Sequence, residues 1–421
     1  MKLLIHSPKK ENQKLKIRTL DPVAVYYLSL KVFGGTMQAV VKEGDRVLKY
    51  QLIAQFEGTF STCLHAPVSG IVERIELSSE AFLVIRNDFK EEELVLPAYD
   101  PGQLTPDELL QRIEEAGIVG CGGAQFPTHL KSGLAKEKKI NHFIVNGTEC
   151  EPYLTADYAV MNEYTSQLLK GISYVQRIVN AGEIVITLER QNRALKAKFE
   201  RSFADFDLPV RVQLVPDVYP QGGELQLIKS VTGMELRKGS RTVEHGVAVS
   251  NVGTLWAVYR AVCERKNFIE RIVSVNSPRN VIGGNFLLRL GTPIRDVIKQ
   301  IVPENTPVEA SMLFVKGGPM MGQALRYLDE GIGKGTGGIL ILPPVKTQTN
   351  NCIGCGYCVD VCPQKLMPLE FVRPAAKEDK AGLEHYHVMD CIECAACAYI
   401  CPSDVPLLES IYRGKQLLRT L

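Results

Sequence analysis

The feature that most constrains this chain is a cysteine pattern that occurs twice near its C-terminal end. In each copy three cysteines follow at three-residue steps, a fourth comes four residues later, and a proline stands directly after it. The copies are Cys352, Cys355, Cys358 and Cys362 before Pro363, and Cys391, Cys394, Cys397 and Cys401 before Pro402. In bacterial ferredoxins with this spacing, three cysteines bind one [4Fe–4S] cluster and the fourth binds the other. The spacing therefore predicts one cluster held by Cys352, Cys355, Cys358 and Cys401, and a second held by Cys391, Cys394, Cys397 and Cys362.

A zinc site or a redox-active cysteine pair is the alternative to this interpretation. Structural zinc usually takes four ligands in two separated pairs, whereas three cysteines follow one another closely in each run here. Thiolate sulfur is a soft ligand that favours iron–sulfur clusters over hard cations. The pattern therefore favours a protein that transfers electrons.

Length and composition set outer limits on the fold and its partners. The 421 residues exceed what one hydrophobic core holds, so three or four domains are expected. Lysine and arginine number 49 against 47 acidic residues, which gives no electrostatic argument for a nucleic-acid partner. The N-terminus is too polar for a secretory signal, and no segment reaches the ~18 apolar residues of a membrane span. We expect a cytoplasmic protein, with a peripheral position on the inner face of the cell membrane left open. Three of the remaining cysteines are expected to be small buried residues: Cys63, Cys150 and Cys263.

Residues 1–98 are predicted to form an all-β domain. Short apolar runs alternate with glycine-containing turns, and segments 41–45 and 65–72 resemble the barrel-sandwich hybrid of lipoyl and biotinyl carriers. Those carriers modify a lysine at a hairpin tip, and no lysine follows Ala66 here. We therefore expect a scaffold or docking domain.

Residues 99–266 are predicted to form an α/β domain with a parallel sheet. Thr105 as N-cap, Pro106 and Glu108 make a capping box before a helical run that Gly117 can end. Strands and helices then alternate, which is the pattern of parallel sheets. The expected strands are 143–145, 184–188, 212–215 and 246–250, and the expected helices are near 168–182, 225–231 and 254–263.

Two further domains are predicted after residue 266. Residues 267–345 contain short strands, many glycines and one helix near 294–301, which indicates a small α+β module of ubiquitin-like size. After a linker at 343–345, the cluster domain covers 346–421. It ends in an amphipathic helix at 407–418 that should pack on its own domain.

A glycine-rich segment directly follows the capped helix. Gly120, Gly122 and Gly123 allow backbone N–H groups to approach an anion, and Lys131 adds positive charge suited to a phosphate. Gln125 stands where the dinucleotide-binding motif has its third glycine, so the segment alone indicates only an ordinary turn. The polar segment that follows it in the sequence strengthens the prediction of a binding site.

A second polar segment begins where the strand 143–145 ends. It contains Asn146, Glu149 and Glu151 before Pro152. Acidic residues usually lie on the surface, but open α/β sheets bind ligands at the carboxyl ends of their strands. The two segments together predict a binding site.

Five segments in a fixed order carry a resemblance to a known family. They are GCGGAQFPTHLK at 120–131, NGTECEPYLTAD at 146–157, YPQGGELQLIKSVTG at 219–233, NVGT at 251–254 and GGPMMG at 317–322. With the cysteines, this order resembles the RnfC family of the Rnf electron-transport complexes, and more distantly the flavin-bearing subunit of respiratory complex I. The resemblance implies a barrel-sandwich hybrid, a Rossmann-like FMN and NADH domain, a soluble-ligand-binding β-grasp module and a two-cluster ferredoxin domain.

The resemblance also implies roles for individual residues. FMN would be held by Gly120, Gly122, Gly123, Phe126, Lys131, Asn146, Glu149, Asn251 and Thr254. NADH would stack on the flavin beside Glu151 and Glu224, the candidate catalytic residues, and Glu189 corresponds to a further acidic position.

The implied function is that of an NADH-dependent oxidoreductase subunit. Hydride from NADH would pass to FMN, and single electrons would then pass through two [4Fe–4S] clusters to a partner, as in an Rnf-type complex. The alternatives are a soluble carrier for a specific reductase of the proline or cobalamin type, a relay without its own NADH site, and a docking scaffold. The physiological acceptor stays open.

The chain departs from the family at two places. Members usually begin with a Gly-His-Pro-Pro stretch, where this chain has only Ile5, His6, Ser7 and Pro8. They also carry a small apolar residue where this chain has Cys121, which is either a harmless isostere or a redox-active thiol.

Overall fold

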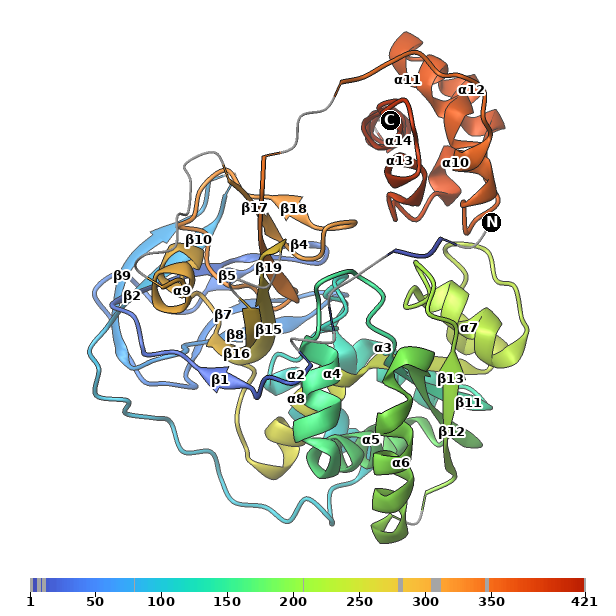
Figure 1. The fold of residues 1–421 in the computed structure, drawn as a ribbon. Helices are drawn as coiled ribbons and strands as arrows, with labels where there is room; N and C mark the ends of the chain where they lie inside the picture. Colours follow the sequence, from blue (N-terminus) through green and yellow to red (C-terminus); the bar gives the residue numbers. More distant parts are fainter. Residues whose placement is uncertain are drawn as a thin grey trace.

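The computed structural model describes residues 3–5, 9, 13–78, 80–206, 208–278, 283–303, 312–344 and 348–419. Four residues named above lie outside the described residues. They are His6, Ser7 and Pro8, from the N-terminal stretch that differs from the family, and Val345 of the expected linker. Figure 1 shows an α/β domain, a β-rich body made from two separate stretches of the chain, and a small helical domain that carries the cysteines.

The α/β domain contains the predicted parallel sheet, with strand order β13-β12-β11-β14. All three pairings are parallel. The strands are β11 (His142–Gly147), β12 (Glu183–Glu189), β13 (Val210–Val215) and β14 (Val247–Asn251). Asn146 is paired with Asn251 at the carboxyl ends of β11 and β14, so the register brings two predicted site residues to one edge.

Helices cover both faces of this sheet. They are α2 (Pro106–Glu115), α3 (Thr128–Lys136), α4 (Ala156–Glu163), α5 (Thr165–Val179), α6 (Arg193–Ser202), α7 (Glu224–Thr232) and α8 (Val252–Cys263). The predicted capping box is confirmed, since Thr105 and Glu108 bond each other's backbone at the start of α2. Helix α5 ends at Val179, and its C-cap Asn180 has a left-handed conformation, two residues before the predicted end at Gly182.

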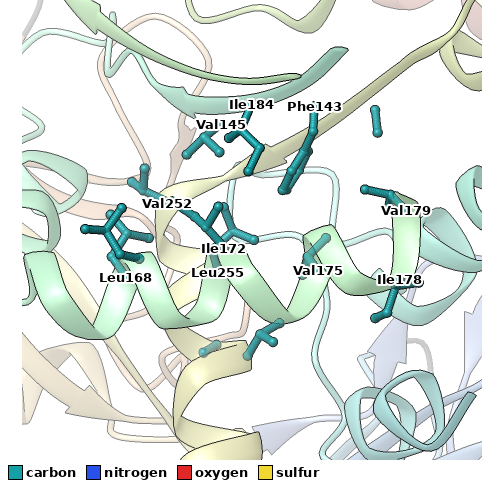
Figure 2. Packing of buried hydrophobic residues seen from close by; sticks show 14 of the residues in the cluster. Phe143, Val145, Leu168, Ile172, Val175, Ile178, Val179, Ile184, Val252 and Leu255 are labelled. Atoms are coloured by element: carbon teal, nitrogen blue, oxygen red, sulfur yellow. The ribbon is translucent and has the colours of Figure 1, made fainter. Parts of the chain in front are cut away.

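The core of the domain lies between α5 and the sheet. Leu168, Ile172 and Val175 on one side of α5 point toward Phe143 and Ile184 (Figure 2), and all five are buried. Each such side chain contributes roughly 1.5–3 kcal/mol of hydrophobic stabilisation.

Helix α8 packs closely against α5 at a glycine. A Cβ on Gly171 would stand 2.0 Å from the carbonyl oxygen of Leu255, so only glycine permits this approach. The contact fixes where α8 begins, and therefore where Asn251 and Thr254 stand.

The N-terminal β-structure forms a sandwich of two small sheets. One sheet has the order β2-β10-β9-β6 and the other β5-β7-β8, and β3 and β4 form a hairpin. The strands are β2 (Val25–Ser29), β3 (Lys31–Val32), β4 (Gly35–Thr36), β5 (Gln38–Ala39), β6 (Arg46–Val47), β7 (Leu52–Phe56), β8 (Thr62–His65), β9 (Gly70–Glu76) and β10 (Phe82–Asn87).

The module after residue 266 is built on a six-stranded sheet of order β1-β16-β15-β19-β17-β18. Its elements are β1 (Arg18–Thr19), β15 (Glu270–Asn276), β16 (Gly283–Arg289), α9 (Ile294–Ile301), β17 (Leu313–Lys316), β18 (Gln323–Ala324) and β19 (Gly338–Leu342). Strand β1 pairs with β16, so Arg18 and Thr19 lie in this sheet and outside the sandwich sheets of the predicted first domain. The module also shares a hydrophobic core with the sandwich, in which Phe286 packs with Leu28 and Leu83. The domain boundaries at 98/99, 266/267 and 345/346 stay predictions.

Short helices build the cysteine-bearing domain. They are α10 (Tyr357–Asp360), α11 (Val372–Lys377), α12 (Lys380–His385), α13 (Ala396–Tyr399) and α14 (Leu407–Arg419). Leu407 and Ile411 of α14 are buried in the core of this domain, as the amphipathic pattern predicts. Among the helices in the described ranges, none is both long and apolar enough to cross a bilayer.

Candidate functional site

The eight cysteines of the two runs surround two cavities. We call Cys362, Cys391, Cys394 and Cys397, which line one cavity, the inner set. The outer set, which lines the other cavity, is Cys352, Cys355, Cys358 and Cys401. Each set combines three cysteines of one run with the fourth of the other, which is the crossed grouping that the spacing predicts. Iron binding at these residues stays a prediction.

Backbone N–H groups point at several of these sulfurs. Those of Gly354, Leu366 and Glu393 donate to the Sγ atoms of Cys352, Cys362 and Cys391 at 3.4, 3.4 and 3.3 Å. The bends use positive φ angles, for example at Gly354, Gly356, Glu393 and Ala395. Hydrogen bonds of this kind stabilise thiolate ligands and tune cluster potentials.

The donor chemistry suits a cluster. All twelve cysteines are free thiols. Within the described part of the chain, no three His, Cys, Asp or Glu side chains are gathered so that they could hold a single metal ion. In a [4Fe–4S] cluster each cysteine binds a different iron, so a cluster site spreads its thiolates around a cavity.

The glycine segment forms the loop between α2 and α3. The Gly120 N–H donates to the carbonyl oxygen of Phe126 at 2.9 Å, which closes the loop. Gly123 has φ +111°, a conformation that other residues rarely adopt, and nothing lies within 4 Å of where its Cβ would stand. A Cβ on Gly122 would face Asn251 at 3.8 Å. The loop therefore leaves open space at its glycines, as close binding of a ligand by the backbone requires.

The N-terminal ends of two helices meet this loop. Asn251 caps α8, because its Oδ1 accepts the Gly253 N–H at 2.8 Å, and its Nδ2 donates to Asp157 at 2.7 Å. The Glu149 carboxylate accepts the N–H groups of Asp157 and Tyr158 at the start of α4, at 3.2 and 3.3 Å. These side chains already pair the first N–H groups of the two helices, so the helix ends favour an anionic group such as a phosphate through their partial positive charge.

Two more predicted residues join the same network. Thr254 Oγ1 accepts the Cys121 N–H at 2.9 Å, which ties α8 to the glycine loop. Asn146 donates to the carbonyl oxygen of Gly222 at 2.9 Å and accepts the Thr148 N–H at 3.0 Å.

Lys131 and Glu224 form an ion pair of 2.8 Å between α3 and α7. Their side chains are 37% and 41% exposed, so the pair is weak and both charges remain available to a ligand. The structure thus brings Glu224 to α3, the helix after the glycine loop, although 93 residues separate it from Lys131.

Glu151 and Phe126 face other domains. The Glu151 carboxylate accepts the N–H groups of Met320 and Met321 at 3.0 and 2.9 Å, in the GGPMMG segment of the β-grasp module. A Cβ on Gly318 would stand 2.2 Å from Glu151 Oε2, which explains the glycine there. The Phe126 ring packs edge-on against Phe33 and Phe60 of the sandwich, with ring centroids 5.4 and 5.7 Å apart. The contacts expected between these two residues and NADH or FMN stay predictions.

Charged residues without an assigned role also lie at this site. Asp157 ends one of the resemblance segments, and its place at the start of a helix was the signal that could have found it. Buried Lys9 donates to the Glu149 carbonyl oxygen and lies 3.9 Å from Glu189. Arg271 donates to the Cys121 carbonyl oxygen at 3.4 Å. No local pattern indicates Lys9 or Arg271, because both reach the site from distant parts of the chain.

Glu149 gives a pH-dependent prediction. Burial and the charge of Asp157 raise the pKa of Glu149 to about 8. Since this exceeds the unfolded value of about 4.5, the stability linked to its proton is present below pH 4.5 and lost as pH rises through 8. We expect Glu149→Gln to remove part of this loss, measured as urea midpoints between pH 5 and 9 from the fluorescence of Trp256, the single tryptophan. The control is Glu115→Gln, which changes an exposed glutamate of α2, and an equal dependence of the urea midpoint on pH in both variants would contradict the prediction.

Cys121 is expected to act as a packing residue. Its side chain is buried, burial raises the pKa of its thiol, and a raised pKa disfavours the reactive thiolate. We expect the Cys121→Ala variant to bind flavin and to be reduced by NADH as the native protein is. Its free energy of unfolding should fall by about 1 kcal/mol. Flavin absorbance and urea unfolding measure both effects. Loss of NADH reduction with flavin still bound would restore a redox role.

Three family comparisons match successive parts of the chain. The RnfC barrel sandwich hybrid domain matches residues 4–84, the Nuo51 FMN-binding domain residues 113–260, and the 4Fe-4S dicluster domain residues 351–405. Together with the fold, they define a multidomain protein of the electron-transfer class, with an FMN-binding type of domain joined to a dicluster domain.

The chain belongs to the RnfC family, the C subunits of ion-translocating oxidoreductase complexes. It is 35% identical to the C subunit of the proton-translocating ferredoxin:NAD(+) oxidoreductase complex of Clostridium ljungdahlii, over 82% of this chain and 79% of that one. It is 36% identical to the C subunit of the ion-translocating oxidoreductase complex of Haemophilus influenzae strain PittEE, over 96% of this chain and 64% of the relative. For a Vibrio cholerae relative of the same name, only 46% of the relative is covered. The chain thus spans about half to two thirds of several relatives. The predicted family and fold class are confirmed.

A solved structure shares the fold. The crystal structure of an NAD+-reducing [NiFe]-hydrogenase in the H2-reduced state matches 76% of this chain and 61% of its own with a TM-score of 0.51. The identity is 18%, so this likeness concerns the fold alone.

Proposed function

We propose that this chain carries electrons between NADH and a protein partner through FMN and two [4Fe–4S] clusters, as the peripheral subunit of an Rnf-type complex. The observation that carries the proposal is the pair of cavities, each lined by four cysteines in crossed grouping, on a chain with an FMN-binding type of domain. The name of the Clostridium relative supports NAD as the substrate. That name describes electron transfer from ferredoxin to NAD+, the opposite direction to NADH oxidation. In this proposal, the reduction potential of the partner sets the direction of electron transfer.

The glycine loop would hold the phosphate of FMN. Gly120 closes the loop through its bond to Phe126, Gly122 and Gly123 would offer backbone N–H groups, and the N-terminal ends of α4 and α8 add partial positive charge. Lys131 lies half-exposed at the start of α3 and would supply a full charge. Bound flavin exchanges a hydride with NADH and single electrons with iron–sulfur clusters.

The surrounding polar residues would orient the two nucleotides. Asn146, Glu149, Asn251 and Thr254 are held by the bonds described above, so their positions are set before a ligand arrives. Glu224, paired with Lys131, is the candidate contact for NADH. Glu151 would act by fixing the turn at Met320 and Met321 beside the site.

In this role the chain would lie in the cytoplasm, at the membrane surface and beside the other subunits. Its partners would be redox proteins, with no nucleic acid among them, since basic and acidic residues balance. A soluble carrier that serves one reductase, and a relay without an NADH site, are the remaining alternatives.

An anaerobic absorbance titration of the purified protein with NADH and then with NADPH tests the proposal. We expect NADH to bleach the flavin band and lower the broad cluster absorbance, because both kinds of centre become reduced. Bound flavin that NADH does not bleach would favour the relay. A colourless, iron-free protein prepared without oxygen would favour a docking scaffold and overturn the proposal.

A further inference from the structure

The two cysteine sets differ in exposure. In the outer set Cys352 and Cys355 are exposed, and their neighbours Ile353 and Tyr357 are 69% and 47% exposed. In the inner set Cys394 and Cys397 are buried. One set therefore faces outward, while the other is covered.

The flavin-type domain covers the inner set together with one turn of the β-grasp module. Cys394 and the adjoining Ala395 and Ala396 share a hydrophobic cluster with Tyr219 and Met320. The Tyr219 hydroxyl donates to the carbonyl oxygen of Cys394 at 2.7 Å, and this tyrosine is 5% exposed.

Polar contacts extend the same interface. Lys238 donates to the carbonyl oxygens of Met389 and Cys391 at 2.8 and 2.7 Å, and Lys365 pairs with Glu235 at 3.1 Å. Figure 1 shows the cysteine-bearing domain lying at the α7 end of the α/β domain.

The loop that contacts Cys394 also reaches the proposed flavin site. Three residues after Tyr219, the carbonyl oxygen of Gly222 accepts the Asn146 side chain at 2.9 Å. Two residues further on, Glu224 pairs at 2.8 Å with Lys131 of α3, the helix that follows the glycine loop. A Cβ on Gly222 would stand 2.3 Å from the carbonyl oxygen of Thr148, so the loop is tightly packed there. Residues 219–224 thus join the two sites by a short, well-packed stretch of chain.

We propose that the inner set holds the cluster that exchanges electrons with the flavin, that the outer set serves the partner, and that Tyr219 is a positioning residue between them. This rests on the proposed function. Each NADH oxidised gives NAD+, one proton to solvent and two electrons, and each of the two clusters takes one electron. Electron transfer between separated centres slows steeply with distance, so a contact that holds the inner set against the flavin-type domain governs this step.

The first test is Tyr219→Phe, which removes the hydroxyl and keeps the ring. Losing one buried hydrogen bond weakens the contact by a factor of roughly five, so we expect cluster reduction after NADH mixing to slow, by at most about that factor. Flavin bleaching should keep its native rate, and the EPR signals of both clusters should be unchanged. The amides of residues 394–397 should exchange hydrogen roughly fivefold faster. The control is Tyr412→Phe, a tyrosine that is 47% exposed on α14 of the cysteine-bearing domain. Unchanged cluster reduction and exchange in Tyr219→Phe would refute its positioning role.

The second test compares Cys394→Ser with Cys355→Ser. We expect NADH to reduce the remaining cluster rapidly in Cys355→Ser, and only slowly in Cys394→Ser, where the inner cluster is lost. Native-rate reduction of the outer cluster in Cys394→Ser would overturn the order of the clusters. Where NADH fails to bleach the flavin, the proposed function fails, and photoreduction of the bound flavin with EDTA replaces NADH as the donor for the same comparison.

A readout without electron transfer checks the order independently. During partial iron removal with a chelator, alkylation should appear first at Cys352 and Cys355 and last at Cys394 and Cys397. The reverse order of labelling would contradict the assignment of inner and outer sets.

Discussion

Cys362→Ser is expected to remove the same [4Fe–4S] cluster as Cys394→Ser, although Cys362 belongs to the other cysteine run. The reason is that Cys362 lines the cavity of Cys391, Cys394 and Cys397. Removing one of four thiolate ligands leaves a cluster open to solvent and oxidation, so each variant should contain about four irons in place of about eight. Iron analysis and EPR of the remaining reduced cluster measure the effect, and the EPR signal should be the same in both variants.

The comparison has two controls. Cys63→Ser changes a cysteine outside both sets and should keep the full iron content. Cys401→Ser should match Cys355→Ser, because both residues line the outer cavity. If Cys362→Ser instead leaves the signal seen in Cys355→Ser, the ligands are grouped run by run, and the crossed arrangement is wrong.

Gly123→Val is expected to abolish most flavin binding and to leave the iron content unchanged. Gly123 has φ +111°, which a β-branched residue adopts only with strain of about 1–3 kcal/mol, and its side chain would enter the open space of the loop. A loss of this size in binding free energy corresponds to roughly 5- to 150-fold weaker binding. Flavin released on denaturation, measured by fluorescence per chain, gives the occupancy.

The matched control is Gly133→Ala in α3, next to the loop. A Cβ at Gly133 meets only Leu110, at 3.9 Å, and alanine favours the helix by about 1 kcal/mol. This variant should keep both flavin and iron. Native flavin content in Gly123→Val would show that the loop does not hold the cofactor.

Much of the fold follows from signals between neighbours in the chain. The capping box at Thr105 and Glu108 and the alternating apolar segments predicted α2 and the parallel sheet, because helix starts and periodicity depend on nearby residues. The crossed cysteine grouping followed from spacing alone, since ligand spacing reflects how one short run bends around a cluster.

Other features needed the tertiary structure. Strand β1 joins the sheet of a module that begins some 250 residues later in the chain. Nothing in the two residues of β1 predicts that they pair with β16. Glu151 stays a predicted nucleotide contact, and only the tertiary structure shows that its carboxylate bonds Met320 and Met321, because a turn of the β-grasp module reaches it. Lysine side chains usually lie on the surface, and only the tertiary structure shows that Lys9 is buried beside Glu189.

Residues that are near neighbours in the chain predict its chemistry: two sets of four cysteines suited to iron–sulfur clusters, a glycine loop suited to a phosphate, and a resemblance to the family to which the chain belongs. The tertiary structure decided how those parts face one another. The bond between Tyr219 and Cys394 joins residues 175 positions apart and gives the two cysteine sets different surroundings. The physical reason is that ligand type and spacing are properties of short segments, whereas the surface against which a cluster site packs depends on how whole domains bury their apolar faces.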